Sequence, residues 1–126
     1  MKSKTTQQDQ SIIQRLEELM DLAGPEFVHE LIEVFLEIGR KDYELMKSAF
    51  KNSSLDKFVG AAHSLKATSL NIGAADLSDY CQAAESHKVF NSKTKVEEVL
   101  ENIEAQLLNA ENLLRGYIKE THSSAS

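Results

Sequence analysis

The sequence has no tryptophan, a single proline, five glycines and only 6% aromatic residues. A β-sandwich or β-barrel needs many turns, and turns are rich in glycine and proline. This scarcity therefore excludes an all-β fold. The length of 126 residues is that of one domain, because two independent cores would each bury too little surface.

Cysteine is almost absent as well, since Cys81 is the only one. One cysteine can form neither an internal disulfide nor a cysteine-rich zinc site. We expect Cys81 to be a small buried residue, and its isolation fits the reducing cytoplasm.

An excess of positive charge and long apolar runs are also missing. The net charge is −6, and no basic cluster offsets it, so we expect no binding to nucleic acid. No stretch approaches the roughly 20 apolar residues of a membrane-spanning helix. The first ten residues are polar and resemble neither a signal peptide nor an anchor. We therefore expect a cytoplasmic protein that contacts no membrane and binds other proteins.

Apolar residues recur at steps of three and four along most of the chain, which is the period of an α-helix. The sequence predicts five helices, over residues 8–22, 25–51, 55–71, 74–89 and 94–117. Gly24 ends the first helix and Pro25 opens the second, in which Gly39 introduces a slight bend. Gly73 follows the third helix and caps it in a left-handed conformation.

Short loops between long helices favour antiparallel neighbours. The predicted fold is therefore all-α, an antiparallel up-and-down four-helix bundle with a short additional N-terminal helix. The bundle covers residues 8–119, between a disordered N-terminal segment (1–7) and a disordered tail (120–126). We expect a monomer, because each helix has one apolar stripe that a single core can absorb.

His63 stands out on the third helix. The apolar or small side chains of that helix form a seam that faces the core: Leu55, Phe58, Ala62, Leu65, Ser69 and Ile72. At about 100° per residue, His63 lies roughly 130° from the middle of this seam, so its ring is expected in solvent.

The neighbours of His63 on the same face suggest a chemical role. Gly60 and Ala67 leave the helix surface low, although glycine costs about 1 kcal/mol relative to alanine inside a helix, so a close approach of another molecule is expected. Lys66 lies one turn away and can pair with an anion on the ring. A neutral imidazole is a nucleophile, and phosphoryl transfer depends mainly on positioning and charge neutralisation. The residues therefore suggest a phosphoryl-accepting site.

The run from His63 to Ala74, HSLKATSLNIGA, resembles the signature of histidine-containing phosphotransfer (HPt) domains, H-x-L-K-G followed by a small residue and a closing Gly-Ala pair. The resemblance extends over most of the chain, including the helix after Pro25 and the long last helix. One position departs from it, because Ala67 stands where the family usually has glycine.

The resemblance implies that His63 carries phosphate between receiver-domain aspartates in a phosphorelay and that Lys66 stabilises the phosphorylated form. The implied partners are receiver domains of response regulators and of a hybrid histidine kinase. No cofactor is expected on this chain, since the receiver supplies Mg²⁺. We expect Gly60, Ala67 and Leu70 to form the docking platform. The family often has a phosphate-supporting residue on the adjacent helix, and Gln82 and Glu85 both remain open for it.

Two alternatives remain. The first is a helical adaptor, a pseudo-HPt domain that binds a partner without phosphotransfer. The second is a metal-binding bundle enzyme, for which Glu26 and His29 have the spacing of di-iron carboxylate proteins. Such a site needs two of these motifs and two further glutamates, and we find one motif, so neither a metal site nor enzymatic activity is expected.

Overall fold

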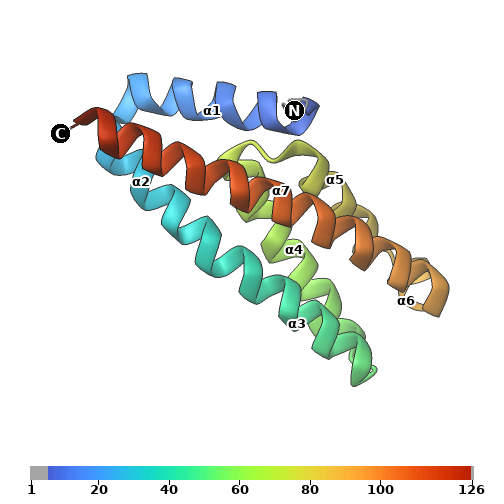
Figure 1. Cartoon of the computed structure of the whole chain (residues 1–126). Helices are drawn as coiled ribbons and strands as arrows, with labels where there is room; N and C mark the ends of the chain where they lie inside the picture. Colours follow the sequence, from blue (N-terminus) through green and yellow to red (C-terminus); the bar gives the residue numbers. More distant parts are fainter. Residues whose placement is uncertain (1–5, 126) are drawn as a thin grey trace.

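The computed structural model describes residues 6–125, and the side chains of residues 6–121, as a set of packed helices (Figure 1). In chain order these are α1 (Gln7–Ala23), α2 (Pro25–Val34), the π-helical turn η1 (Phe35–Gly39), α3 (Arg40–Lys51), α4 (Leu55–Ile72), α5 (Ala75–Ala84), α6 (His87–Phe90) and α7 (Lys93–Ala125). No strand occurs in this part of the chain. The all-α bundle with an additional N-terminal helix is confirmed.

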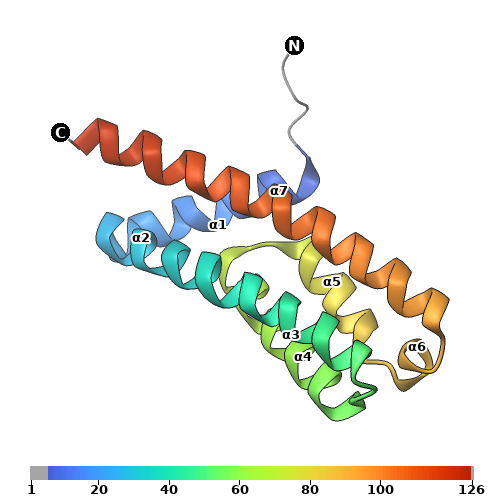
Figure 2. The ribbon, with the colours of Figure 1, turned by 60° about the horizontal axis from the view of Figure 1, so that its bottom comes forward.

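The bundle is formed by four long antiparallel runs. The first run consists of α2, η1 and α3, the second is α4, and the third is α5. The fourth is α7, which passes along the whole body (Figure 2). Helix α4 packs against both α3 and α5. Its outer face is therefore flanked by these two helices, and this arrangement positions the site described below.

Helix α1 is fixed to the bundle by a buried glutamine. The Gln8 side chain donates to the carbonyl of Gln106 in α7 (3.2 Å) and accepts from the backbone N–H of Leu77 in α5 (2.7 Å). Thr6 and Asp9 form a reciprocal capping box at the start of α1, which satisfies free backbone N–H groups. Gln7 is thus helical, although it falls in the segment 1–7 that was expected to be disordered. Residues 1–5 of that segment lie outside the described residues.

The second predicted helix, 25–51, is interrupted by the π-helical turn η1. Its last residue, Gly39, is buried, and a Cβ placed there would lie 3.5 Å from Leu107 and 3.7 Å from Leu65. These are ordinary van der Waals distances, so η1 packs against α7 and α4 at this residue. A π-turn adds a residue to the helical repeat, which periodicity counted over the whole segment does not reveal.

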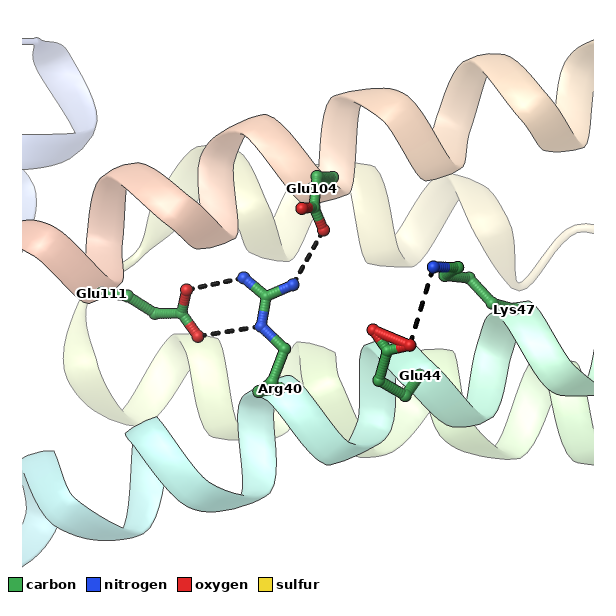
Figure 3. A network of polar contacts seen from close by, with 5 residues as sticks. All are labelled: Arg40, Glu44, Lys47, Glu104 and Glu111. Carbon is green, nitrogen blue, oxygen red and sulfur yellow. Dashed lines mark hydrogen bonds and ion pairs between the residues drawn. The ribbon is translucent and has the colours of Figure 1, made fainter.

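Directly after η1, Arg40 connects the first run to α7 (Figure 3). Its Nε and Nη2 donate to the two carboxylate oxygens of Glu111 (3.1 and 2.6 Å), and its Nη1 donates to Glu104 (2.8 Å). The Glu111 side chain is only 4% exposed. A buried carboxylate is tolerated when it is paired and hydrogen-bonded, so Arg40 allows Glu111 to lie in the bundle. The Glu44–Lys47 pair in the same figure is exposed and contributes little.

The last two predicted helices end at other residues in the structure than the sequence predicts. The fourth, predicted over 74–89, ends at Ala84, and the short α6 follows, where Phe90 packs on Phe58 with ring centroids 5.2 Å apart. Helix α7 continues to Ala125. Residues 120–125 of the expected disordered tail 120–126 are therefore helical, and residue 126 lies outside the described residues. Thr121 takes part in the packing, because its hydroxyl lies 2.7 Å from Nε2 of His29.

The core consists mainly of the apolar stripes of α1, α2, α3, α4, α5 and α7. No helix among the described residues is both long and apolar enough to cross a lipid bilayer.

Candidate functional site

His63 projects from the outer face of α4. Its side chain is 67% exposed, whereas Ala62 and Leu65 beside it are fully buried. The helical phase thus places the imidazole in solvent, where the sequence predicts it.

Glu85 joins His63 and Lys66 into one cluster. Its Oε1 lies 3.0 Å from Nδ1 of His63, and its Oε2 lies 2.7 Å from Nζ of Lys66. Glu85 is the residue at which α5 ends, and α5 packs along α4. The end of α5 therefore delivers a carboxylate to the histidine on the neighbouring helix.

Sequence reasoning left Glu85 and Gln82 as equal candidates for this place. Glu85 occupies it, whereas Gln82 is exposed. The missing signal was the break after Ala84. A helix continuing to residue 89 gives no reason to prefer one position over the other, because the choice depends on how α5 is set against α4.

The electrostatics of the cluster favour an ionised Glu85. Partial burial acts to raise the pKa of this carboxyl, but Lys66 and His63 outweigh burial and lower its pKa below the ordinary value. Glu85 is therefore a carboxylate at neutral pH, and a carboxylate only accepts hydrogen bonds.

This charge state determines the tautomer of the ring. Since Glu85 can only accept, Nδ1 of His63 carries the proton and donates it to Oε1. The other nitrogen of a neutral imidazole then has a free lone pair. In His63 that nitrogen is Nε2, on a ring that stands largely in solvent.

The surface around the ring is low. A Cβ built at Gly60 would find no atom within 4 Å, so the space above this residue is open. Ala67 and Leu70 are exposed on the same helix. Gly73 closes α4 in the left-handed conformation, with φ of +85°, and donates its N–H to the carbonyl of Leu70.

The residues considered for other chemistry lie elsewhere. His29 contacts Thr121, and no group of three or more metal-ligating side chains is found in the part of the chain that the structure describes. Cys81 is fully buried, and burial, with smaller contributions from Glu85 and Asp42, raises the pKa of its thiol to about 12. A thiol with such a pKa is a poor nucleophile at neutral pH.

The comparisons with known proteins point to one family. The family model described as "Hpt domain" matches residues 30–115. The crystal structure of histidine-containing phosphotransfer protein B (HptB) from Pseudomonas aeruginosa PAO1 is similar, with a TM-score of 0.78 and 19% sequence identity over 85% of this chain and 92% of that one. No curated protein sequence matches.

The family model covers more than half of the chain, including the whole of α4 and Glu85, and the HptB structure has the same fold. The chain therefore belongs to the Hpt domain family, whose members carry phosphoryl groups and interact with receiver domains in two-component signalling.

Proposed function

We propose that His63 accepts a phosphoryl group at Nε2 from a receiver-domain aspartyl phosphate and transfers it to the aspartate of another receiver domain. The observation that supports this proposal is the contact between Nδ1 of His63 and the Glu85 carboxylate, because in the neutral ring it places the proton on Nδ1 and the lone pair on the exposed Nε2. A nucleophile in this state needs no separate base.

In the proposed transfer, the Nε2 lone pair forms a bond to phosphorus while the bond from phosphorus to the aspartate oxygen breaks. The aspartate leaves as a carboxylate. The imidazole keeps its Nδ1 proton and becomes cationic, and the ionised Glu85 stabilises that charge. The reverse steps transfer the group to the next aspartate, so the protein is a carrier that is regenerated.

Lys66 is proposed to stabilise the phosphorylated form. Its ammonium lies 2.7 Å from Glu85 and one turn of helix from His63, within the same cluster. When the phosphoryl group is present, the ammonium can be shared between the Glu85 carboxylate and the phosphoryl oxygens. Charge-assisted hydrogen bonds of this kind are about twice as strong as neutral ones.

The proposed partners are receiver domains of response regulators and of a hybrid histidine kinase. They dock on the platform formed by Gly60, Ala67 and Leu70, and the protein acts as a monomer. The receiver supplies Mg²⁺ as well as the aspartate, so this chain needs no cofactor. The relay would operate in the cytoplasm, together with these receivers.

A labelled receiver domain tests the proposal. The receiver carries radiolabelled aspartyl phosphate and is incubated with the protein, and we expect acid-labile, alkali-stable label on the wild type and none on His63→Gln. His87→Gln removes another exposed histidine and should label normally. NMR of the phosphorylated protein should place the phosphoryl group on Nε2.

Two results would contradict the proposal. Equal labelling of His63→Gln would exclude His63 as the acceptor. A receiver that binds the wild type without transferring label would favour the non-catalytic adaptor instead.

A further inference from the structure

A groove of about 410 Å³ runs between α3 and α4 beside His63. Its lining includes Gly60, three residues before His63, and Ser64, the residue after it. The groove therefore adjoins the surface around the imidazole on which a receiver domain is proposed to dock.

One wall of the groove is apolar. Leu45 lines it and is 49% exposed, although it lies on a helix whose neighbouring apolar residues, Met46 and Ala49, are buried. On the opposite side, Gly60 leaves open space where a side chain would otherwise stand. The groove can thus admit the aliphatic part of a long side chain.

A carboxylate lies deep in the groove. Asp42 is 7% exposed and lines the groove, and its Oδ2 accepts a hydrogen bond of 2.6 Å from the Ser64 hydroxyl. Within the described residues, this is the only hydrogen bond that Asp42 receives through its side chain. A carboxylate has about four acceptor sites, so Asp42 can accept further hydrogen bonds from a group that enters the groove.

The charge of Asp42 is also poorly compensated. Burial raises the pKa of its carboxyl, and the Ser64 hydroxyl and Lys41 oppose this only in part. Lys57 also lines the groove, but no ion pair joins it to Asp42 among the described residues. An added donor that reaches the carboxylate would therefore be stabilising.

We propose that the groove receives an arginine side chain of the docked receiver domain, whose guanidinium pairs with Asp42 while its aliphatic stem packs on Leu45. This inference rests on the proposed function, since the docking surface is the one around His63. Arginine fits because its stem is apolar, whereas its planar head donates several hydrogen bonds and is more weakly hydrated than an ammonium. Asp42 and Leu45 would then contribute to partner specificity without touching the reacting atoms.

Transfer kinetics test the inference. With a phosphorylated receiver as the substrate, Asp42→Asn should raise the KM by about tenfold, because a charge-assisted pair is lost, while the maximal transfer rate stays within about twofold. Asparagine can still accept from Ser64, so the fold should be kept, and circular dichroism checks this. Leu45→Ala should raise the KM less.

A control variant and a second measurement separate docking from indirect effects. Leu108→Ala removes an exposed leucine of α7, a helix that contributes no residue to the groove, and should leave the KM unchanged. Asp42→Asn should also leave the decay of label on the phosphorylated protein, measured without receiver, at the wild-type rate. If this decay changes together with the KM, the effect passes through His63 and the inference is wrong.

A double-mutant cycle identifies the occupant. Each arginine on the docking face of the receiver is replaced by glutamine, and one replacement should raise the KM with the wild-type protein but not with Asp42→Asn. The absence of such coupling for every arginine would overturn the inference. That failure is distinct from failure of the proposed function, because the loss of label in His63→Gln is measured in the same assay.

Discussion

At the residue scale, Glu85 has two opposing effects on His63. Its carboxylate holds the Nδ1 proton and stabilises a cationic ring, which favours attack by Nε2. The same carboxylate repels an incoming phosphoryl group and already pairs with Lys66, which disfavours the phosphorylated form. A glutamate here should therefore make the histidine quick to react and quick to lose its phosphoryl group.

Glu85→Gln separates the two effects. The amide oxygen can still accept from Nδ1, but the charge is gone and Lys66 is released from its ion pair. We expect slower labelling and a longer-lived phosphorylated form, each by about tenfold, which corresponds to about 1.4 kcal/mol. The initial rate of labelling and the decay of label measure both.

The matched control is Gln82→Ala, on the exposed face of the same helix, which should leave both rates unchanged. If Glu85→Gln changes the rates of labelling and decay in opposite directions, or leaves either rate unchanged, the opposing roles of the carboxylate are wrong.

The pH dependence of stability gives a further check on Glu85. Because the pKa of Glu85 is lowered in the folded protein, its contacts stabilise the fold above the unfolded pKa, and this contribution disappears as the pH falls through the folded pKa. The stability difference between wild type and Glu85→Gln should therefore narrow on acidification.

At the scale of elements, the sequence predicted the relative positions of site residues that lie on the same helix. His63, Lys66 and Gly60 lie on α4, so a helical period of 3.6 residues is enough to place them on one face. Glu85 and Asp42 belong to other helices and reach α4 across 22 residues of sequence each. Periodicity shows which face of a helix is apolar, but it does not show the axial offset between two packed helices.

The interrupted elements could not be predicted for a related reason. The π-turn at η1 lies where Gly39 packs against α7 and α4, and the break after Ala84 lies in a segment whose pattern is compatible with a continuous helix. The connection from Arg40 to Glu111 spans 71 residues. These features follow from tertiary packing, which overrides local preference.

Gly73 at the end of α4 and Gly116 inside α7 allow the effect of a glycine-to-alanine substitution on stability to be compared at two kinds of helical position. At Gly73, with φ of +85°, a Cβ would lie 2.7 Å from Cβ of Arg15 and 2.8 Å from the carbonyl oxygen of Ser11. Gly73→Ala should therefore lower the free energy of unfolding by about 2–3 kcal/mol, from backbone strain and the clash with α1. Urea unfolding followed by circular dichroism measures this.

Gly116 lies inside α7, and a Cβ there would meet nothing within 4 Å. Gly116→Ala should raise the free energy of unfolding by up to about 1 kcal/mol, because alanine is the better helix former. A neutral result at Gly73, or a loss of stability at Gly116, would show that the contacts of these two glycines are described wrongly.

At the scale of the whole molecule, the surface has to serve docking without self-association. The core absorbs the inner face of every long helix, and the large apolar side chains left outside are spread over five helices: Leu22, Phe27, Val34, Leu45, Leu70 and Leu108. The net charge of −6 opposes the association of identical copies. Both features favour a monomer whose partners differ from itself.

Sedimentation equilibrium should therefore give the mass of one chain, 14.1 kDa, over a wide range of concentrations, and the Tm should not depend on concentration. We expect a monomer also because two exposed leucines lie close to His63. Leu45 lines the groove beside His63, and Leu70 lies two helical turns beyond His63 on the same face of α4, so a dimer formed through these leucines would cover the histidine that has to meet a receiver domain. Twice the monomer mass, with a Tm that rises with concentration and a rate of labelling that falls with it, would mean that self-association and docking compete for one surface.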